Sequence, residues 1–166
     1  FIVICADVDQ AFEACDSSLV FSSFCYFARM FVSVFGTSQL MVKEGRKSAV
    51  KVGAKGFGGA SFCFSLEMLG TAVLAYTYMT LVCYGDFVWR LKGLAIGGVL
   101  GTVCVSLVLG SSETRFLKDV AGLVALGLPD WFAADPLSFI SWMRYVDDIF
   151  CVTGALCADC LVLLMK

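Results

Sequence analysis

The sequence predicts an α+β fold in which a small antiparallel sheet is backed by helices. Two adjacent carboxylates, Asp147 and Asp148, lie between runs of aromatic and β-branched residues, a composition typical of a β-hairpin with a tight turn. An apolar run over 1–6 ends at Asp7 and predicts a buried central strand with a carboxylate at its C-terminal edge. Longer apolar stretches with capping residues and glycine stops lie between them, which predicts the helices.

The first elements after this strand are a helix and a hairpin. Asp16 or Ser17 can cap a helix that reaches about Phe35, with Gly36 as its stop. Residues 39–52 alternate loosely around a turn that contains glycine, which predicts a hairpin.

The remaining elements follow in chain order. We expect a helix from Ser65 to about Tyr78, a second hairpin over 79–92, a glycine-rich loop over 93–101, a helix to Leu109 with Gly110 behind it, an amphipathic helix over 114–126, and a loop over 129–136 that leads into the acidic hairpin.

Length and composition limit the classes of protein. The 166 residues suffice for one domain with a core, and we treat 1–166 as a single domain that is part of a longer chain. A net charge of −2 excludes a globally basic nucleic-acid binder, and the lack of His excludes a His-containing zinc site. Nine cysteines without a recognisable secretory leader favour a reducing compartment over a disulfide framework. Cys157 and Cys160 form a lone CxxC motif, which by itself establishes neither a metal site nor a redox site.

The adjacent carboxylates predict a site for a hard cation. Neighbouring carboxylates repel each other, so a half-buried pair stays ionised when a cation lies against it. Oxygen ligands of this kind suit Mg²⁺ or Mn²⁺. A solvated Asp-Asp turn is the alternative, since Asp is common in turns.

Basic residues are concentrated in one short segment. Five of the twelve Lys and Arg residues fall within thirteen positions: Lys43, Arg46, Lys47, Lys51 and Lys55. Clustered cations of this kind contact nucleic-acid phosphates, and a solvated hairpin tip is the alternative. We regard 38–57 as a possible basic hairpin insertion.

Three stretches in order resemble the palm motifs of reverse transcriptases, with telomerase-like and retroelement enzymes nearest. They are Asp-Val-Asp-Gln-Ala-Phe at 7–12, Lys-Gly-Leu-Ala-Ile-Gly-Gly-Val-Leu at 92–100, which continues into the helix after it, and Tyr-Val-Asp-Asp at 145–148. The last is the most specific. The sequence departs from the family at Ala95, where Pro is usual, and at 99–101, where Pro-Leu-Ser is often found.

The resemblance implies a polymerase palm fragment without complete fingers or thumb, which carries out RNA-templated DNA synthesis with two Mg²⁺ ions, or with Mn²⁺. The partners implied are an RNA template, a DNA primer and deoxynucleoside triphosphates, in the nucleus or the cytoplasm. The resemblance implies that the metals are bound by Asp7, Asp147, the Val8 carbonyl and, as a weaker ligand, Asp148. The nucleotide is then contacted by Phe12, which lies under the sugar, and by Lys92, Gly93, Gly97 and Tyr145. The template is contacted by Lys43, Arg46, Lys47 and Lys51.

Two other classes of protein stay open. Residues 68–85 and 93–112 are uncharged and long enough to cross a bilayer, so a polytopic membrane protein is one alternative. Against it, the second run holds five glycines, and carboxylates such as Asp7 are costly in lipid. The other alternative is a palm-like module that binds nucleic acid without catalysis. We expect no membrane partner.

Overall fold

The computed structural model describes residues 2–8, 11–44, 50–53, 62–95, 98, 100–125 and 127–164. It confirms an α+β fold with small antiparallel sheets and helices. The chain forms two compact units, one of residues 1–11 with 109–166 and one of residues 12–108. Each unit is described by itself.

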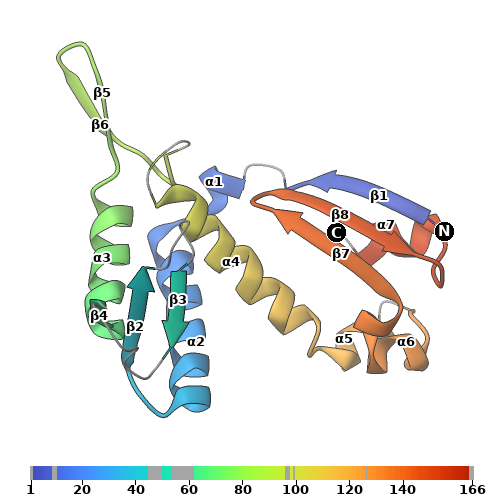
Figure 1. Cartoon of the computed structure of the whole chain (residues 1–166). Helices are drawn as coiled ribbons and strands as arrows, with labels where there is room; N and C mark the ends of the chain where they lie inside the picture. The colour runs from blue at the N-terminus through green and yellow to red at the C-terminus, as the bar shows by residue number, and fades with distance from the viewer. Residues whose placement is uncertain are drawn as a thin grey trace. The chain divides into compact units, whose positions relative to one another are not determined.

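The first unit contains a three-stranded antiparallel sheet, made of β1 (Ile2–Asp7), β7 (Ile140–Tyr145) and β8 (Asp148–Thr153) (Figure 1). The strand order is β1-β8-β7, so the prediction that residues 1–6 form a central strand is wrong, and β8 is central. Val3 and Cys5 are exposed, whereas Ile2 and Ile4 pack against the core. Because both faces of this edge strand carry apolar residues, its sequence does not show the alternation of a half-buried strand.

Helices cover the face of this sheet that carries Ile2 and Ile4, and they form the core together with the strands. They are α5 (Val120–Ala125), α6 (Asp130–Ala134) and α7 (Ala158–Leu164). Their buried side chains join those of β7 and β8 in one cluster, which contains Leu123, Leu128, Phe132, Ala133, Ile140, Cys151, Leu156 and Leu161. Phe132 is fully buried, and a side chain of this kind stabilises a fold by about 1.5–3 kcal/mol when it leaves water.

The segment that leads into this core differs from the prediction. The helix expected to stop before Gly110 is α4 (Gly101–Phe116), which continues for six residues beyond that glycine. The helix predicted over 114–126 is interrupted at 117–119: α4 ends at Phe116, and α5 begins after Asp119, whose carboxylate accepts a hydrogen bond from Gly122 N–H (2.9 Å). The loop expected over 129–136 contains α6 and is followed by the 3₁₀ helix η2 (Pro136–Ser138).

In the second unit, two predicted helices are confirmed together with their caps. Helix α2 (Ser17–Phe35) begins where the Asp16 carboxylate accepts a hydrogen bond from Leu19 N–H (2.7 Å), and it ends at Gly36, with φ of 68°. The Leu19 N–H lowers the pKa of Asp16, and the Ser18 hydroxyl adds to this. Helix α3 (Leu66–Tyr78) begins at Ser65, whose hydroxyl accepts from Met68 N–H. The two helices pack together.

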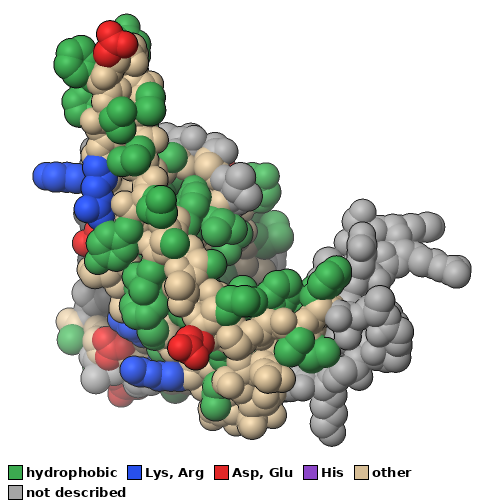
Figure 2. Space-filling model, turned by 90° about the vertical axis from the view of Figure 1, so that its left-hand side faces the viewer, with side chains coloured by type: hydrophobic (Ala, Val, Ile, Leu, Met, Phe, Trp, Pro, Cys, Tyr) green, Lys and Arg blue, Asp and Glu red, His purple; other side chains and the backbone are tan. Residues whose placement is uncertain are grey.

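The strands of the second unit form two further sheets. The predicted basic hairpin is present as β2 (Gln39–Glu44) paired with β3 (Val50–Gly53). A third strand, β4 (Phe62–Ser65), pairs with β2 and was not predicted. The second predicted hairpin is β5 (Leu81–Tyr84) with β6 (Phe87–Arg90), and all eight of its strand residues are exposed. Figure 2 shows hydrophobic side chains gathered along it.

The two segments proposed as membrane spans are not single helices. Helix α3 ends at Tyr78 and β5 follows, while residues 93–95 precede α4 without helical structure. A different described helix, α2, is long and apolar enough to cross a membrane by length and composition alone.

Candidate functional site at the acidic end of the β1-β8-β7 sheet

The backbone brings the three predicted metal-binding acids to one end of the sheet. Asp7 lies directly opposite Asp148 in the β1–β8 register, and Asp148 lies opposite Tyr145 in the β7–β8 register. The Val8 N–H donates a hydrogen bond to the Asp147 carbonyl (3.1 Å), one step beyond the last strand pair. Residues separated by about 140 positions in the chain therefore meet at neighbouring backbone positions.

The turn that carries Asp147 has a strained backbone. Residues 146 and 147 connect the strands, and Asp148 is the first residue of β8, so only one of the two acids lies in the turn. Val146 has φ of 57°. Hairpin turns of two residues use positive φ at this position and favour Gly or Asn there, whereas a β-branched residue with positive φ costs about 1–3 kcal/mol. Such an outlier is typical of a functional site.

Arg144 holds this turn in place. Its Nη1 donates a hydrogen bond to the Val146 carbonyl (2.9 Å), and its Nε lies 2.6 Å from a carboxylate oxygen of Glu113 in α4. The two side chains are 16% and 27% exposed, so the ion pair is partly shielded from water. The guanidinium therefore links the strained turn to Glu113, which lies in the part of α4 that belongs to the same unit.

Sequence reasoning missed the role of Arg144 and Glu113. Arg144 is the one charged residue of β7, and Glu113 lies near the end of the mostly apolar helix α4, which also carries Arg115. Opposite charges of this kind in two apolar segments were the available signal, but nothing in the sequence places the two segments together.

The acidic end is open on the face of the sheet away from the helices. A shallow hollow there is lined in part by Cys5, Met143, Tyr145, Asp148 and Phe150. Tyr145 is 79% exposed, and Asp148 is exposed beside it. A ligand can therefore approach this end of the sheet from solvent.

The residues at this end fit a hard divalent cation by their chemistry. They supply three carboxylates and the carbonyl of Val8, all oxygen donors of the kind that Mg²⁺ prefers. The Val8 carbonyl already accepts a hydrogen bond from Ala11 N–H (3.2 Å), which occupies one of its two lone pairs. Within the residues whose side chains are described, no group of three His, Cys, Asp or Glu residues forms a metal cage, and the Asp7 side chain is outside that set.

Two of the residues predicted to contact the nucleotide lie together in the second unit. Phe12 belongs to α1 (Ala11–Ala14), and its carbonyl accepts a hydrogen bond from Leu94 N–H (2.9 Å). Gly93 has φ of 109°, and a Cβ at this position would lie 2.7 Å from the carbonyl oxygens of Phe12 and Glu13. Gly93 is therefore required for contact between two backbone segments. Lys92 is exposed, and Gly97 lies outside the described residues.

A second glycine of this loop packs against a tyrosine. A Cβ on Gly98 would overlap the hydroxyl of Tyr76, which is buried and has no hydrogen-bond partner among the residues that the structure describes. At Gly93 and Gly98 the close neighbours are therefore α1 and Tyr76.

The predicted template-binding residues are only partly described. Lys43 in β2 lies opposite Lys51 in β3 in the backbone register, whereas Arg46 and Lys47 lie outside the described residues. The structure thus confirms that the strands under this cluster pair.

No protein-family model and no curated protein matches this chain. The assignment of the acidic end therefore depends on its own geometry and on the motifs quoted above.

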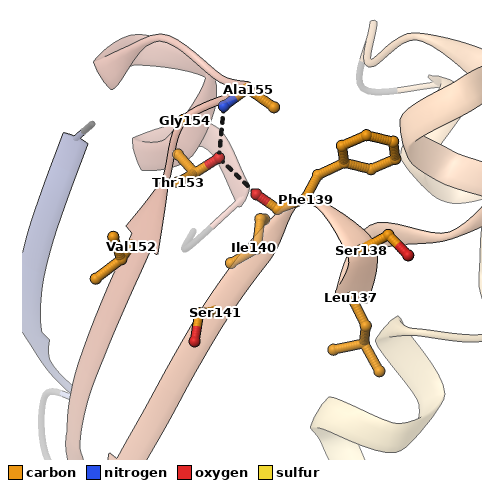
Figure 3. Close-up of a pocket in the computed structure, with 9 residues that line it drawn as sticks. All are labelled: Leu137, Ser138, Phe139, Ile140, Ser141, Val152, Thr153, Gly154 and Ala155. Atoms are coloured by element: carbon orange, nitrogen blue, oxygen red, sulfur yellow. Dashed lines mark hydrogen bonds between the residues drawn. The ribbon is translucent and has the colours of Figure 1, made fainter.

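The opposite end of the β7–β8 hairpin has a different character. A hollow there is lined by residues 137–141 and 152–155, none of which is ionisable (Figure 3). The Thr153 hydroxyl donates to the Phe139 carbonyl (2.8 Å) and accepts from Ala155 N–H (3.1 Å). The residues that line this hollow therefore include no acid or base for chemistry.

Proposed function

We propose that this chain is the palm of an RNA-directed DNA polymerase and that the acidic end of its β1-β8-β7 sheet is the nucleotidyl-transfer site. The observation that carries the proposal is the register in which Asp7 lies opposite Asp148 and next to the turn at Asp147. A solvated Asp-Asp turn gives no reason for a third acid to meet the pair from the far end of the sequence.

In this proposal Asp7 and Asp147 bind both metal ions, and Asp148 supports them from the first position of β8. Two Mg²⁺ ions held by these residues would supply activation of the 3′-hydroxyl of the primer and neutralisation of the charge of the triphosphate. Because the guanidinium of Arg144 bonds the Val146 carbonyl, it fixes the position of the adjacent Asp147. Phe12 excludes a 2′-hydroxyl by its ring, and the cluster from Lys43 to Lys51 contacts template phosphates.

Association with a membrane is the second candidate, and one observation favours it. Helix α2 has the length and composition of a membrane span, and it exposes Met30, Val32, Val34 and Phe35. Fractionation of the expressed protein separates the two candidates, since recovery only in detergent extracts favours the membrane.

The direct test of the proposal is primer extension on an RNA template. A polymerase that contains this chain extends the primer with deoxynucleotides in Mg²⁺ or Mn²⁺, and Asp147→Asn abolishes extension while Asp86→Asn leaves it intact. The Phe12→Ala variant is expected to keep extension but to lose discrimination against ribonucleotides. Because steric exclusion by the Phe12 ring supplies it, the wild-type preference for deoxynucleotides is expected to exceed the roughly 10- to 200-fold that one methylene supplies. Template binding without extension by the wild-type protein favours the non-catalytic module.

A further inference from the structure

The CxxC motif that the polymerase proposal leaves unused forms a close pair of thiols. The Sγ atoms of Cys157 and Cys160 are 3.2 Å apart. A disulfide bond is about 2.05 Å long, so the two sulfurs need to approach by only about 1 Å to form one. Cys157 is exposed and Cys160 is half-buried, and reagents from solvent therefore reach the first of them.

The chain on both sides of the pair is anchored to the core. Ahead of it, Ala155 N–H bonds the Thr153 hydroxyl, which is the contact drawn in Figure 3, and Leu156 is buried. Behind it, Leu161 is buried and its N–H donates to the Cys157 carbonyl (3.0 Å). The two sulfurs are thus held near each other by residues that fold with the sheet.

The environment distinguishes the two thiols from each other and from the buried cysteines. The Cys160 N–H lies 3.4 Å from Sγ of Cys157, and this bond, followed by the hydrogen bond between the two thiols, lowers the pKa of Cys157. The pKa of Cys160 is raised, first by its hydrogen bond to Cys157. Burial raises the pKa of Cys151 and raises that of Cys15 to about 11, so these thiols are poor nucleophiles.

We propose that Cys157 and Cys160 form a redox-active dithiol that exchanges with low-molecular-weight disulfides. The Cys157 thiolate attacks one sulfur of the disulfide RSSR, which forms a mixed disulfide and releases one RS⁻. The Cys160 thiolate then attacks Sγ of Cys157, forms the Cys157–Cys160 disulfide and releases the second RS⁻. The two protons from the protein thiols go to the two RS⁻ groups, so the dithiol is oxidised and RSSR is reduced to two RSH.

This site is independent of the polymerase proposal, because none of its steps uses the acidic end of the sheet. The two sulfurs lie beyond Thr153, at the end of β8 away from Asp148. Failure of either proposal leaves the other in place.

The test uses the intact 166-residue chain in buffers with different ratios of reduced to oxidised glutathione. Trypsin releases residues 145–166 as one peptide, which holds Cys151, Cys157 and Cys160. Free thiols are alkylated before digestion, and fragmentation locates each label. The exposed thiol of Cys63, whose sulfur lies 3.5 Å from the amide oxygen of Gln39, is the matched control.

The expected result is a disulfide between Cys157 and Cys160 at glutathione ratios that leave Cys63 free to react with the alkylating reagent. The Cys160→Ser variant should accumulate glutathione on Cys157, since the second thiolate is missing, and Cys157→Ser should form neither product. Cys157 should also react with iodoacetamide several-fold faster than Cys63 at neutral pH. Equal oxidation of Cys157 and Cys63, or a mixed disulfide that persists on wild-type Cys157, would overturn the proposal.

Discussion

Two hairpins of this protein have the same turn but opposite surroundings. In β5–β6 the turn is Gly85–Asp86 after Tyr84, and in β7–β8 it is Val146–Asp147 after Tyr145. The first turn residue has φ of 58° in one and 57° in the other. Glycine adopts this conformation without cost, whereas valine is strained in it. The strained turn is the one that bonds Arg144 and meets Asp7 across the sheet.

Backbone strain lies in the hairpin that packs against a core. Hairpin β7–β8 packs against a helical core through Ile140 and Cys151, while every strand residue of β5–β6 is exposed. A packed hairpin can keep an unfavourable turn because its other contacts determine the backbone. The following predictions test that account in order of expected effect.

The largest effect is expected from removing the core beneath β7–β8. Phe132→Ala should lower the free energy of unfolding of that unit by about 3–5 kcal/mol, because a fully buried ring leaves a cavity. Trp89→Ala, in the exposed hairpin, should change it by less than about 0.5 kcal/mol. Native-state hydrogen exchange at the β8 amides measures both, and equal effects would contradict the comparison.

A smaller loss is expected from breaking the ion pair that holds the turn. Glu113→Gln should cost about 1–2 kcal/mol, since Arg144 keeps a partly shielded charge without its partner. Glu67→Gln, at an exposed position of α3, is the control and should be near neutral. A double-mutant cycle of Glu113 with Arg144 measures the coupling between them, and coupling near zero would remove Arg144 from its role at the turn.

The smallest effect, and one of opposite sign, is expected at the turn itself. Val146→Gly should raise stability by up to about 1 kcal/mol, because relief of the strain exceeds the entropic cost of glycine. Gly85→Val should lower the stability of its hairpin, as it introduces the same strain where no core opposes it. Amide exchange in each hairpin measures the gain expected for Val146→Gly and the loss expected for Gly85→Val. A loss of stability in Val146→Gly would show that the valine side chain is needed for packing.

The sequence predicted much of the local structure and little of what depends on tertiary packing. The caps at Asp16 and Ser65 and the turn at Gly85–Asp86 follow from short-range residue chemistry, which is why they were predicted. The acidic turn was predicted at Asp147 and Asp148 but lies at Val146 and Asp147, where the bond from Arg144 helps to hold a residue that turn chemistry alone disfavours. The edge position of β1 and the break between α4 and α5 depend on packing partners far along the chain.

The same division applies to the candidate site. Asp147 and Asp148 were recognisable from their apolar flanks, whereas the contact between Arg144 and Glu113 joins two segments that only the folded chain brings together. Gly93 was predicted to contact a nucleotide, and the structure places the backbone of α1 close to it.

A metal site at the acidic end of the sheet can be detected by Mn²⁺ binding to the 166-residue chain, followed by electron paramagnetic resonance. The account predicts binding that Mg²⁺ competes away, that is lost in Asp147→Asn, and that is unchanged in Asp86→Asn, which removes the acid at the same position of the other turn. Equal binding by the two variants, or no binding by the wild-type chain, would contradict a metal site at the acidic end of the sheet.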